Sequence, residues 1–272
     1  MREILFENVG IDKLNLQVKQ LSKDIVTALN EGDNIGMSDF VTFGREKKNF
    51  FTIWLHTSPS RPELFGRLSI KDDYAFINVD TPQLKRKCDR TDPRSIMNLP
   101  VWLDYVCTAL GTEIIGITHL DLKFDSSHNY EKDIITLSNK YDLIIGGRKA
   151  NEENFYKTKG IKKNSPVTIY IKKNKTWLVR FYNKTKEKGK NTELDSPYIH
   201  RIEISFKGCK QIRDILLNTN PNCNNIDTLI SLYLGDYDFL NKVYVHALNK
   251  TAVLRHKRKR VGLGNFLVGE LI

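Results

Sequence analysis

The sequence predicts an α+β fold: an antiparallel β-sheet backed by helices, with a helical C-terminal part. Two observations favour this class. Segments with period-two alternation of apolar and polar residues follow one another through short polar turns, most densely between residues 113 and 207, and such short links join antiparallel strands. Segments of helical spacing follow each of two groups of strands, whereas a parallel sheet would need a helix after each strand.

In the first part of the chain we expect two helices and two strands. Residues 14–30 have the apolar spacing of a helix, and residues 93–111 have it in their second half, where Gly111 supplies a stop. The apolar and β-branched segments 50–58 and 74–80 are typical of strands.

Strands dominate the second part, and helical spacing returns over 209–250, before a tail that is first basic and then apolar. We expect one α+β domain over 1–208 and a helical C-terminal segment over 209–272 that packs on it and ends in a basic tail. The expected strands of this part cover residues 113–125, 141–148, 166–173, 177–184 and 198–207.

The net charge of the 272-residue chain is unusual. Lys and Arg exceed Asp and Glu so far that the formal charge is +11 at pH 7, while the apolar fraction of 40% and the charged fraction of 28% are ordinary for a globular protein. A strong positive charge indicates a polyanionic partner, with nucleic acid as the first candidate and an anionic membrane surface as the second. A basic protein without such a partner is the alternative.

The cysteines and the apolar segments bear on the compartment. The four cysteines have no C-x-x-C spacing and no histidine at zinc-site spacing, which favours reduced thiols. The first residues carry charge at once and lack the apolar core of a signal peptide, and no stretch approaches 18 apolar residues. We therefore expect a cytoplasmic protein without a membrane segment.

Three of the expected strands place charged side chains on one face. Asp121 and Asp125 alternate with leucine and phenylalanine in the first, Arg180 and Tyr182 with apolar residues in the second, and Glu203 with isoleucines in the third. An antiparallel sheet often has a solvated polar face, but carboxylates are poor strand residues, and hard oxygen ligands suit Mg²⁺ or Mn²⁺. Asp121 and Asp125 lie about 13 Å apart on an ideal strand, which is too far for both to bind one ion directly. One of them paired with Glu203 is therefore the better candidate set of ligands.

Tyr182 lies between two cations of its strand, Arg180 and Lys184. Nearby cations favour the phenolate, and an arginine can bind a phosphate in bidentate fashion, which together would equip a tyrosine to cut a DNA strand through a phosphotyrosine link. The alternative is a tyrosine that fills a strand position. Tyr156 and Tyr170 are rival nucleophiles, but Tyr170 has apolar neighbours and no arginine two residues before it.

The segments "THLDLKFD", "WLVRFYNKTKE" and "HRIEISFK" resemble, in order and spacing, the trans-acting (Rep_trans) family of replication initiators of rolling-circle plasmids, and related relaxases. The likeness covers about residues 70–210, and its most specific block is the one that contains Tyr182. It departs from the family pattern at His119, where the family has an arginine.

The resemblance implies a curved antiparallel sheet, a dimer, a divalent metal (Mg²⁺ or Mn²⁺) and a 5′-phosphotyrosine intermediate on a nicked origin. It also implies a DNA partner that is a duplex with an extruded hairpin and then a single strand. Without a P-loop, strand separation would need a host helicase. A relaxase with the same chemistry and a non-catalytic origin-binding protein are alternatives. The implied catalytic residues are Tyr182, Arg180, Lys184 and Arg201, and the implied metal ligands are Asp121, Asp125 and Glu203, with His119 and His200 as open additions.

Two basic segments are candidates for contacts with phosphates, although each could be a solvated surface. One precedes the strand that carries Tyr182, and the other follows the last expected helix, where the apolar end after it is expected to pack. The candidates are Lys162, Lys163, Lys172, Lys173, Lys175, Arg255, Lys257, Arg258, Lys259 and Arg260.

Overall fold

The computed structural model describes residues 9–32, 39–56, 62–80, 98–158, 168–184, 200–220, 229–230 and 233–269. The helices are α1 (Lys23–Glu31), α3 (Leu99–Ala109), α4 (Tyr130–Lys140), α6 (Cys209–Thr219), α8 (Tyr237–Thr251) and α9 (Leu263–Leu267). The strands are β1 (Gly10–Val18), β2 (Val41–Lys47), β3 (Phe50–Leu55), β4 (Glu63–Lys71), β5 (Tyr74–Val79), β6 (Ile114–Ser126), β7 (Asp142–Ile145), β8 (Arg148–Lys149), β9 (Phe155–Lys157), β10 (Ile169–Asn174), β11 (Trp177–Asn183), β12 (His200–Lys207), β13 (Ala252–His256) and β14 (Lys259–Gly262).

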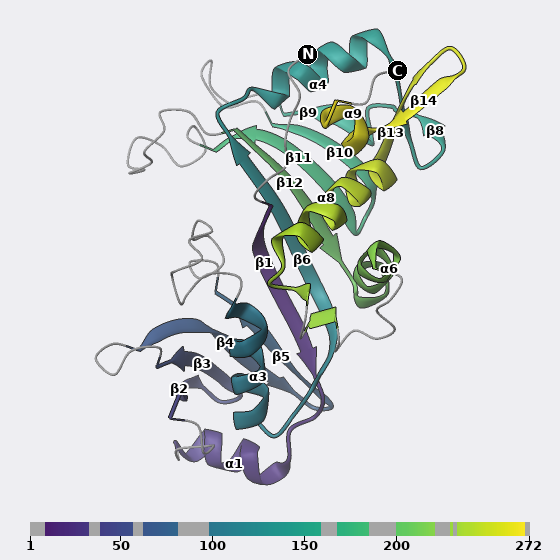
Figure 1. Ribbon diagram of the computed structural model, residues 1–272. Helices are drawn as coiled ribbons and strands as arrows, with labels where there is room; N and C mark the ends of the chain where they lie inside the picture. Colours follow the sequence, from purple (N-terminus) through teal and green to yellow (C-terminus); the bar gives the residue numbers. More distant parts are fainter. Residues whose placement is uncertain are drawn as a thin grey trace. The chain divides into compact units, whose positions relative to one another are not determined.

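Ten of these strands form one open antiparallel sheet in the order β2-β3-β4-β5-β1-β6-β12-β11-β10-β9, and a smaller sheet has the order β14-β13-β7-β8 (Figure 1). Helices back the large sheet, which confirms the predicted α+β class. Among the described residues, no helix is long and apolar enough to cross a membrane.

The chain divides into two compact units. The first contains Gly10–Leu120 and Lys207–Leu240, and the second contains Asp121–Phe206 and Asn241–Ile272, together with the first nine residues. This division differs from the boundary expected at residue 208, because most of α8 and the strands after it belong with Asp121–Phe206.

In the first unit, the helix expected over 14–30 is wrong in its first half. Leu14, Leu16 and Val18 are fully buried in β1 and alternate with more exposed residues, which is the burial pattern of a strand. Helix α1 begins only after Ser22, whose hydroxyl accepts a hydrogen bond from the Ile25 backbone N–H. A short apolar run fits both periodicities, and pairing of β1 with β5 decides for the strand.

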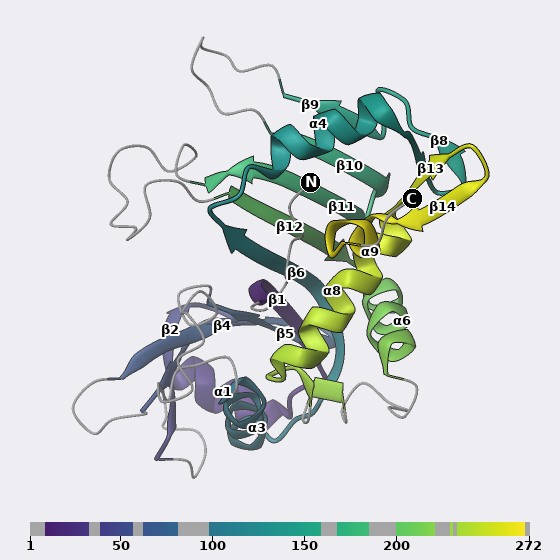
Figure 2. The ribbon, with the colours of Figure 1, turned by 45° about the horizontal axis from the view of Figure 1, so that its top comes forward.

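In the second unit, β9 to β12 lie side by side with α4 and α8 across them (Figure 2). The apolar face of these strands packs on the helices. The Trp177 indole N–H of β11 donates a 2.8 Å hydrogen bond to the Thr251 hydroxyl at the end of α8, and the Tyr244 hydroxyl donates one of 2.9 Å to the Ile202 carbonyl. The opposite face of the same strands is therefore left for the charged residues.

The expected basic tail is also wrong, because residues 252–262 form the hairpin of β13 and β14 beside β7. Cations on both sides of the hairpin turn interrupt the alternation of apolar and polar residues in these strands. The sequence pattern therefore resembles a basic tail. Beyond the hairpin, Phe266 and Leu267 are buried in α9, as expected for an apolar end that packs.

Candidate active site

The pairing of β11 with β12 brings predicted site residues together. Tyr182 lies directly opposite Arg201, and Arg180 lies directly opposite Glu203. Directly opposite residues of an antiparallel pair project from the same face of the sheet. The alternation predicted from the sequence therefore places these four side chains on one face, away from α8.

Glu203 is the centre of this group. The Tyr182 hydroxyl donates a 2.8 Å hydrogen bond to Glu203 Oε2, and the Arg180 guanidinium forms an ion pair with Glu203 Oε1. Glu203 is 3% exposed and Tyr182 5% exposed, so the tyrosine hydroxyl lies in a nearly dry environment beside a carboxylate. Lys184 reaches over the tyrosine, with its Nζ 5.5 Å from the ring centroid.

Asp125 and Arg201 form a second group on the same face. Arg201 donates from Nε to Asp125 Oδ1 at 2.5 Å and from Nη2 to Oδ2 at 2.7 Å, and Lys123 Nζ lies 3.5 Å from Oδ2. Burial raises the pKa of Asp125, but the hydrogen bond and the charge of Arg201, with Lys123, outweigh burial and hold this pKa below its ordinary value. Asp125 is therefore an ionised partner of a buried arginine.

Asp121 acts on the first group. Burial lowers the pKa of the Arg180 guanidinium, but the charges of Glu203, Tyr182 and Asp121 outweigh it and raise this pKa. Asp121 is buried like Glu203, with 6% of its surface exposed. The Nε atom of Arg180 is buried and has no hydrogen-bond partner among the described residues.

The donor set fits a small divalent ion only in part. Asp121 and Glu203 are buried carboxylates whose charges both act on the Arg180 guanidinium, and carboxylate oxygens are ligands that Mg²⁺ and Mn²⁺ prefer. Asp125 has both oxygens engaged by Arg201 and does not join them. Within the described ranges, no group of three or more His, Cys, Asp or Glu side chains lies close enough to hold a metal ion. The three-carboxylate set stays a prediction.

His200 is part of a separate buried pair. Its Nδ1 lies 2.8 Å from Glu131 Oε2 of α4, its Nε2 lies 3.4 Å from Asn183 Nδ2, and it lies opposite Asn183 in the sheet. His200 therefore projects from the other face than Glu203. Sequence reasoning missed Glu131, since it did not foresee α4; the acidic first turn of this helix, after the N-cap Asn129, was the available signal.

The predicted phosphate contacts fall in different places. Lys172 and Lys175 are exposed around the turn between β10 and β11, whereas Lys173 lies over the Trp177 ring, 3.8 Å from its centroid. Burial and the charge of Lys250 lower the pKa of Lys173. Lys162 and Lys163 lie outside the described residues.

The second basic segment forms the exposed tip of the β13–β14 hairpin. Arg255 pairs with Asp142 at 3.0 Å, and a pocket of about 620 Å³ beside the hairpin is lined by Arg255, Lys149 and Lys140, among others. The exposed cations of the hairpin are Lys257, Arg258, Lys259 and Arg260.

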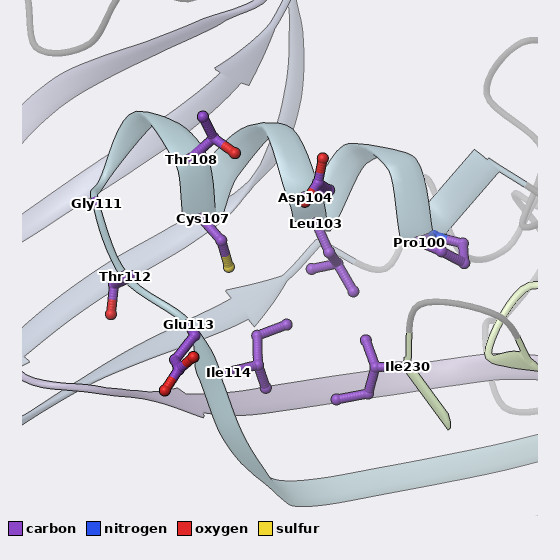
Figure 3. Close-up of a pocket in the computed structure, with 10 residues that line it drawn as sticks. All are labelled: Pro100, Leu103, Asp104, Cys107, Thr108, Gly111, Thr112, Glu113, Ile114 and Ile230. Atoms are coloured by element: carbon purple, nitrogen blue, oxygen red, sulfur yellow. The ribbon is translucent and has the colours of Figure 1, made fainter. Parts of the chain in front are cut away.

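Another pocket, of about 320 Å³, lies in the first unit beside α3 (Figure 3). Leu103 and Cys107 of α3 point toward Ile114 and Ile230, so its floor is apolar. It brings together no pair of acid and base or cluster of cations, and we assign it no chemistry.

The fold is similar to a solved structure, a rolling circle replication initiator protein from Geobacillus stearothermophilus. The TM-score is 0.50 and the sequence identity 12%, over an alignment that covers 95% of this chain and 95% of that chain. At this identity the likeness concerns the fold. No protein-family model and no curated protein sequence matches the chain.

Proposed function

We propose that this protein is a replication initiator of the rolling-circle type, which nicks and rejoins one DNA strand at an origin through Tyr182. The observation that carries the proposal is the hydrogen bond from the Tyr182 hydroxyl to Glu203, on a sheet face where two arginines flank the tyrosine. The fold of the Geobacillus initiator and the net charge of +11 support the same function.

In the proposed reaction, Tyr182 Oη attacks the phosphorus of a phosphodiester while Glu203 Oε2 accepts the phenolic proton. The new bond joins Oη to phosphorus, the bond from phosphorus to the 3′ oxygen breaks, and the departing 3′ oxygen takes a proton from water. The products are a 5′-phosphotyrosine and a free 3′-OH that can prime synthesis. The Glu203 carboxylate is already placed for this transfer, because it accepts a 2.8 Å hydrogen bond from the Tyr182 hydroxyl in the absence of DNA.

Arg180 supplies the complementary charge. Its side chain is 33% exposed, whereas its partner Glu203 is buried, so the arginine can reach a phosphate without leaving the site. Its unpaired Nε gains an acceptor if a phosphate oxygen enters. Arg201, held by Asp125, lies directly opposite Tyr182. Lys184 adds charge over the ring.

A divalent ion, Mg²⁺ or Mn²⁺, would be held by Asp121 and Glu203 and would stabilise the charge that develops on the phosphoryl oxygens. The ion would compete with Arg180 for these carboxylates. Half-maximal activity should therefore need a higher metal concentration than in a site without such a competitor.

The remaining expectations belong to the same proposal. The partner is an origin duplex with an extruded hairpin, and later a single strand; a second subunit or water resolves the intermediate, and a host helicase opens the duplex. A relaxase would use the same chemistry on a transferred strand. A non-catalytic origin-binding protein would form no covalent adduct.

The test is incubation with supercoiled plasmids that carry candidate origins, in Mg²⁺ or Mn²⁺. Relaxed circles and a protein that stays bound to a 5′ end under denaturing conditions are expected. Binding without nicking or adduct, over all origins tested and with both metals, would support the non-catalytic alternative.

A further inference from the structure

A straight row of four side chains crosses four neighbouring strands of the second unit. Glu203 of β12 lies opposite Arg180 of β11, Arg180 lies opposite Tyr170 of β10, and Tyr170 lies opposite Tyr156 of β9. Because directly opposite side chains share a face, the row leads from the proposed catalytic group to β9, the last strand of the sheet.

The two tyrosines of this row stack on each other. Their ring centroids are 4.9 Å apart and their planes differ by 13°. Tyr156 is 39% exposed, which is unusual for a large aromatic side chain, and it lies on the last strand of the sheet. Tyr170 is a diagonal neighbour of Tyr182, and such neighbours lie about 7–8 Å apart. A flat, partly exposed aromatic pair thus lies beside the proposed nucleophile.

The charged side chains next to the pair in the sheet are cations, although Glu203 pairs with one of them, Arg180. Lys172 follows Tyr170 by two residues, so it projects from the same face, and it is exposed. Arg180 lies beside Tyr170 in the row, and Lys184 lies over Tyr182. A polymer that carries both flat rings and regular negative charges matches this combination of aromatic rings and cations better than an apolar peptide does.

We propose that Tyr156 and Tyr170 form a stacking site for an unpaired DNA base, next to the phosphate that Arg180 and Tyr182 engage. The inference rests on the proposed function and adds to it a contact with the single strand. Stacking tolerates any base, because every base offers a π face. The site therefore holds the strand in place and does not read its sequence. A cross-strand pair that only stabilises the β9–β10 hairpin is the competing explanation.

The experiment uses the full chain in EDTA, so that no cleavage is needed, and measures the anisotropy of fluorescein-labelled oligo(dT). Tyr156→Leu removes the ring, Tyr156→Phe keeps it, and Tyr74→Leu alters a tyrosine that is 47% exposed on β5, in the first unit. We expect Tyr156→Leu to weaken binding about tenfold or more, the order found for one stacked base, and the other two variants to bind as the wild type does.

A strand of the same length built from abasic nucleotides is the second arm. It carries the same phosphates without rings, so the wild type and Tyr156→Leu should bind it equally. The inference fails if Tyr156→Leu binds oligo(dT) like the wild type, if the loss is as large on the abasic strand, or if the wild type binds no oligo(dT). Adduct formation by the wild type in Mg²⁺, read separately on a denaturing gel, reports on the proposed function alone.

Discussion

The Tyr182 hydroxyl and the Glu203 carboxylate are joined by a hydrogen bond of 2.8 Å across two neighbouring strands, in a position where both side chains are buried. This contact gives a weakly acidic hydroxyl a proton acceptor within the protein. Glu203 thus has two roles, because the same carboxylate also pairs with Arg180. The first two predictions test the hydroxyl and the carboxylate in turn.

Tyr182→Phe should abolish the covalent adduct while DNA binding survives. Loss of the hydroxyl also leaves one hydrogen bond to a buried carboxylate unmade, so we expect stability to fall by about 1–2 kcal/mol. A denaturing gel of the adduct, thermal melting and a binding titration measure the three effects. Tyr170→Phe is the control and should keep the adduct, because the proposed stacking role of Tyr170 needs its ring and not its hydroxyl. Nicking by Tyr182→Phe at the wild-type rate would refute the assignment.

Glu203→Gln keeps the size of the side chain and removes its charge. If Glu203 accepts the phenolic proton, nicking should fall by about 10²–10⁴-fold, the range for loss of a general base, and added metal should not restore it. Asp121→Asn should act differently: it should raise the Mg²⁺ or Mn²⁺ concentration needed and be rescued at high metal. The readout is the nicking rate against metal concentration. A fully active Glu203→Gln, Asp121→Asn double variant would remove both residues from the mechanism.

The Asp125–Arg201 pair should make the second unit sensitive to acid. The pKa of Asp125 is lower in the folded protein than its ordinary value near 4, so its contribution to stability is complete above that value and is lost as pH falls through the folded pKa. Asp125→Asn should remove this part of the pH dependence. It should also cost about 1–3 kcal/mol at neutral pH, because Arg201, 4% exposed, loses the acceptor of two hydrogen bonds, whereas Asp125 itself is exposed to water.

Urea unfolding between pH 3 and 7 measures both effects. Asp73→Asn, at an exposed turn between β4 and β5, is the control and should leave the curve unchanged. Equal stability of Asp125→Asn and the wild type at pH 7 would show that the pair does not support the fold.

Lys172 and Lys173 should differ in DNA binding although they are adjacent. Lys172 is exposed on the face that carries Tyr182, whereas Lys173 covers the Trp177 ring on the other face. Lys172→Ala should reduce the slope of log affinity against log salt by up to about 0.9 on duplex DNA, the value for one phosphate. Lys173→Ala should leave the slope unchanged. Salt titrations of both variants decide this, and an equal loss for both would place the DNA elsewhere.

The sequence alone predicted that the charged residues share one face of the sheet. Alternation along β11 and β12 placed Arg180, Tyr182, Arg201 and Glu203 on one face, because a strand has only two faces. It did not reveal which residue faces which. Register depends on turns and on packing of distant segments, so the contact of Tyr182 with Glu203 could not be derived from spacing alone.

Burial was the other feature that the alternation did not reveal. The pattern of β12 predicted one solvated face, but Arg201, Glu203 and Ser205 are nearly as buried as the apolar residues between them. The strand is central in the sheet, with β6 on one side and β11 on the other. A strand's position in the sheet order comes from tertiary pairing, which local sequence does not encode.

The hairpin that carries the exposed cations has Lys257 at its turn with φ of 53°, in the left-handed region. For a residue with a Cβ atom this conformation costs about 1–2 kcal/mol, and glycine or asparagine would adopt it more readily. Stability and charge therefore oppose each other at this one position. Optimising this turn for thermal stability would select Lys257→Gly. The same substitution would remove a positive charge from the tip of the hairpin, so higher thermal stability would come with weaker binding of a polyanion.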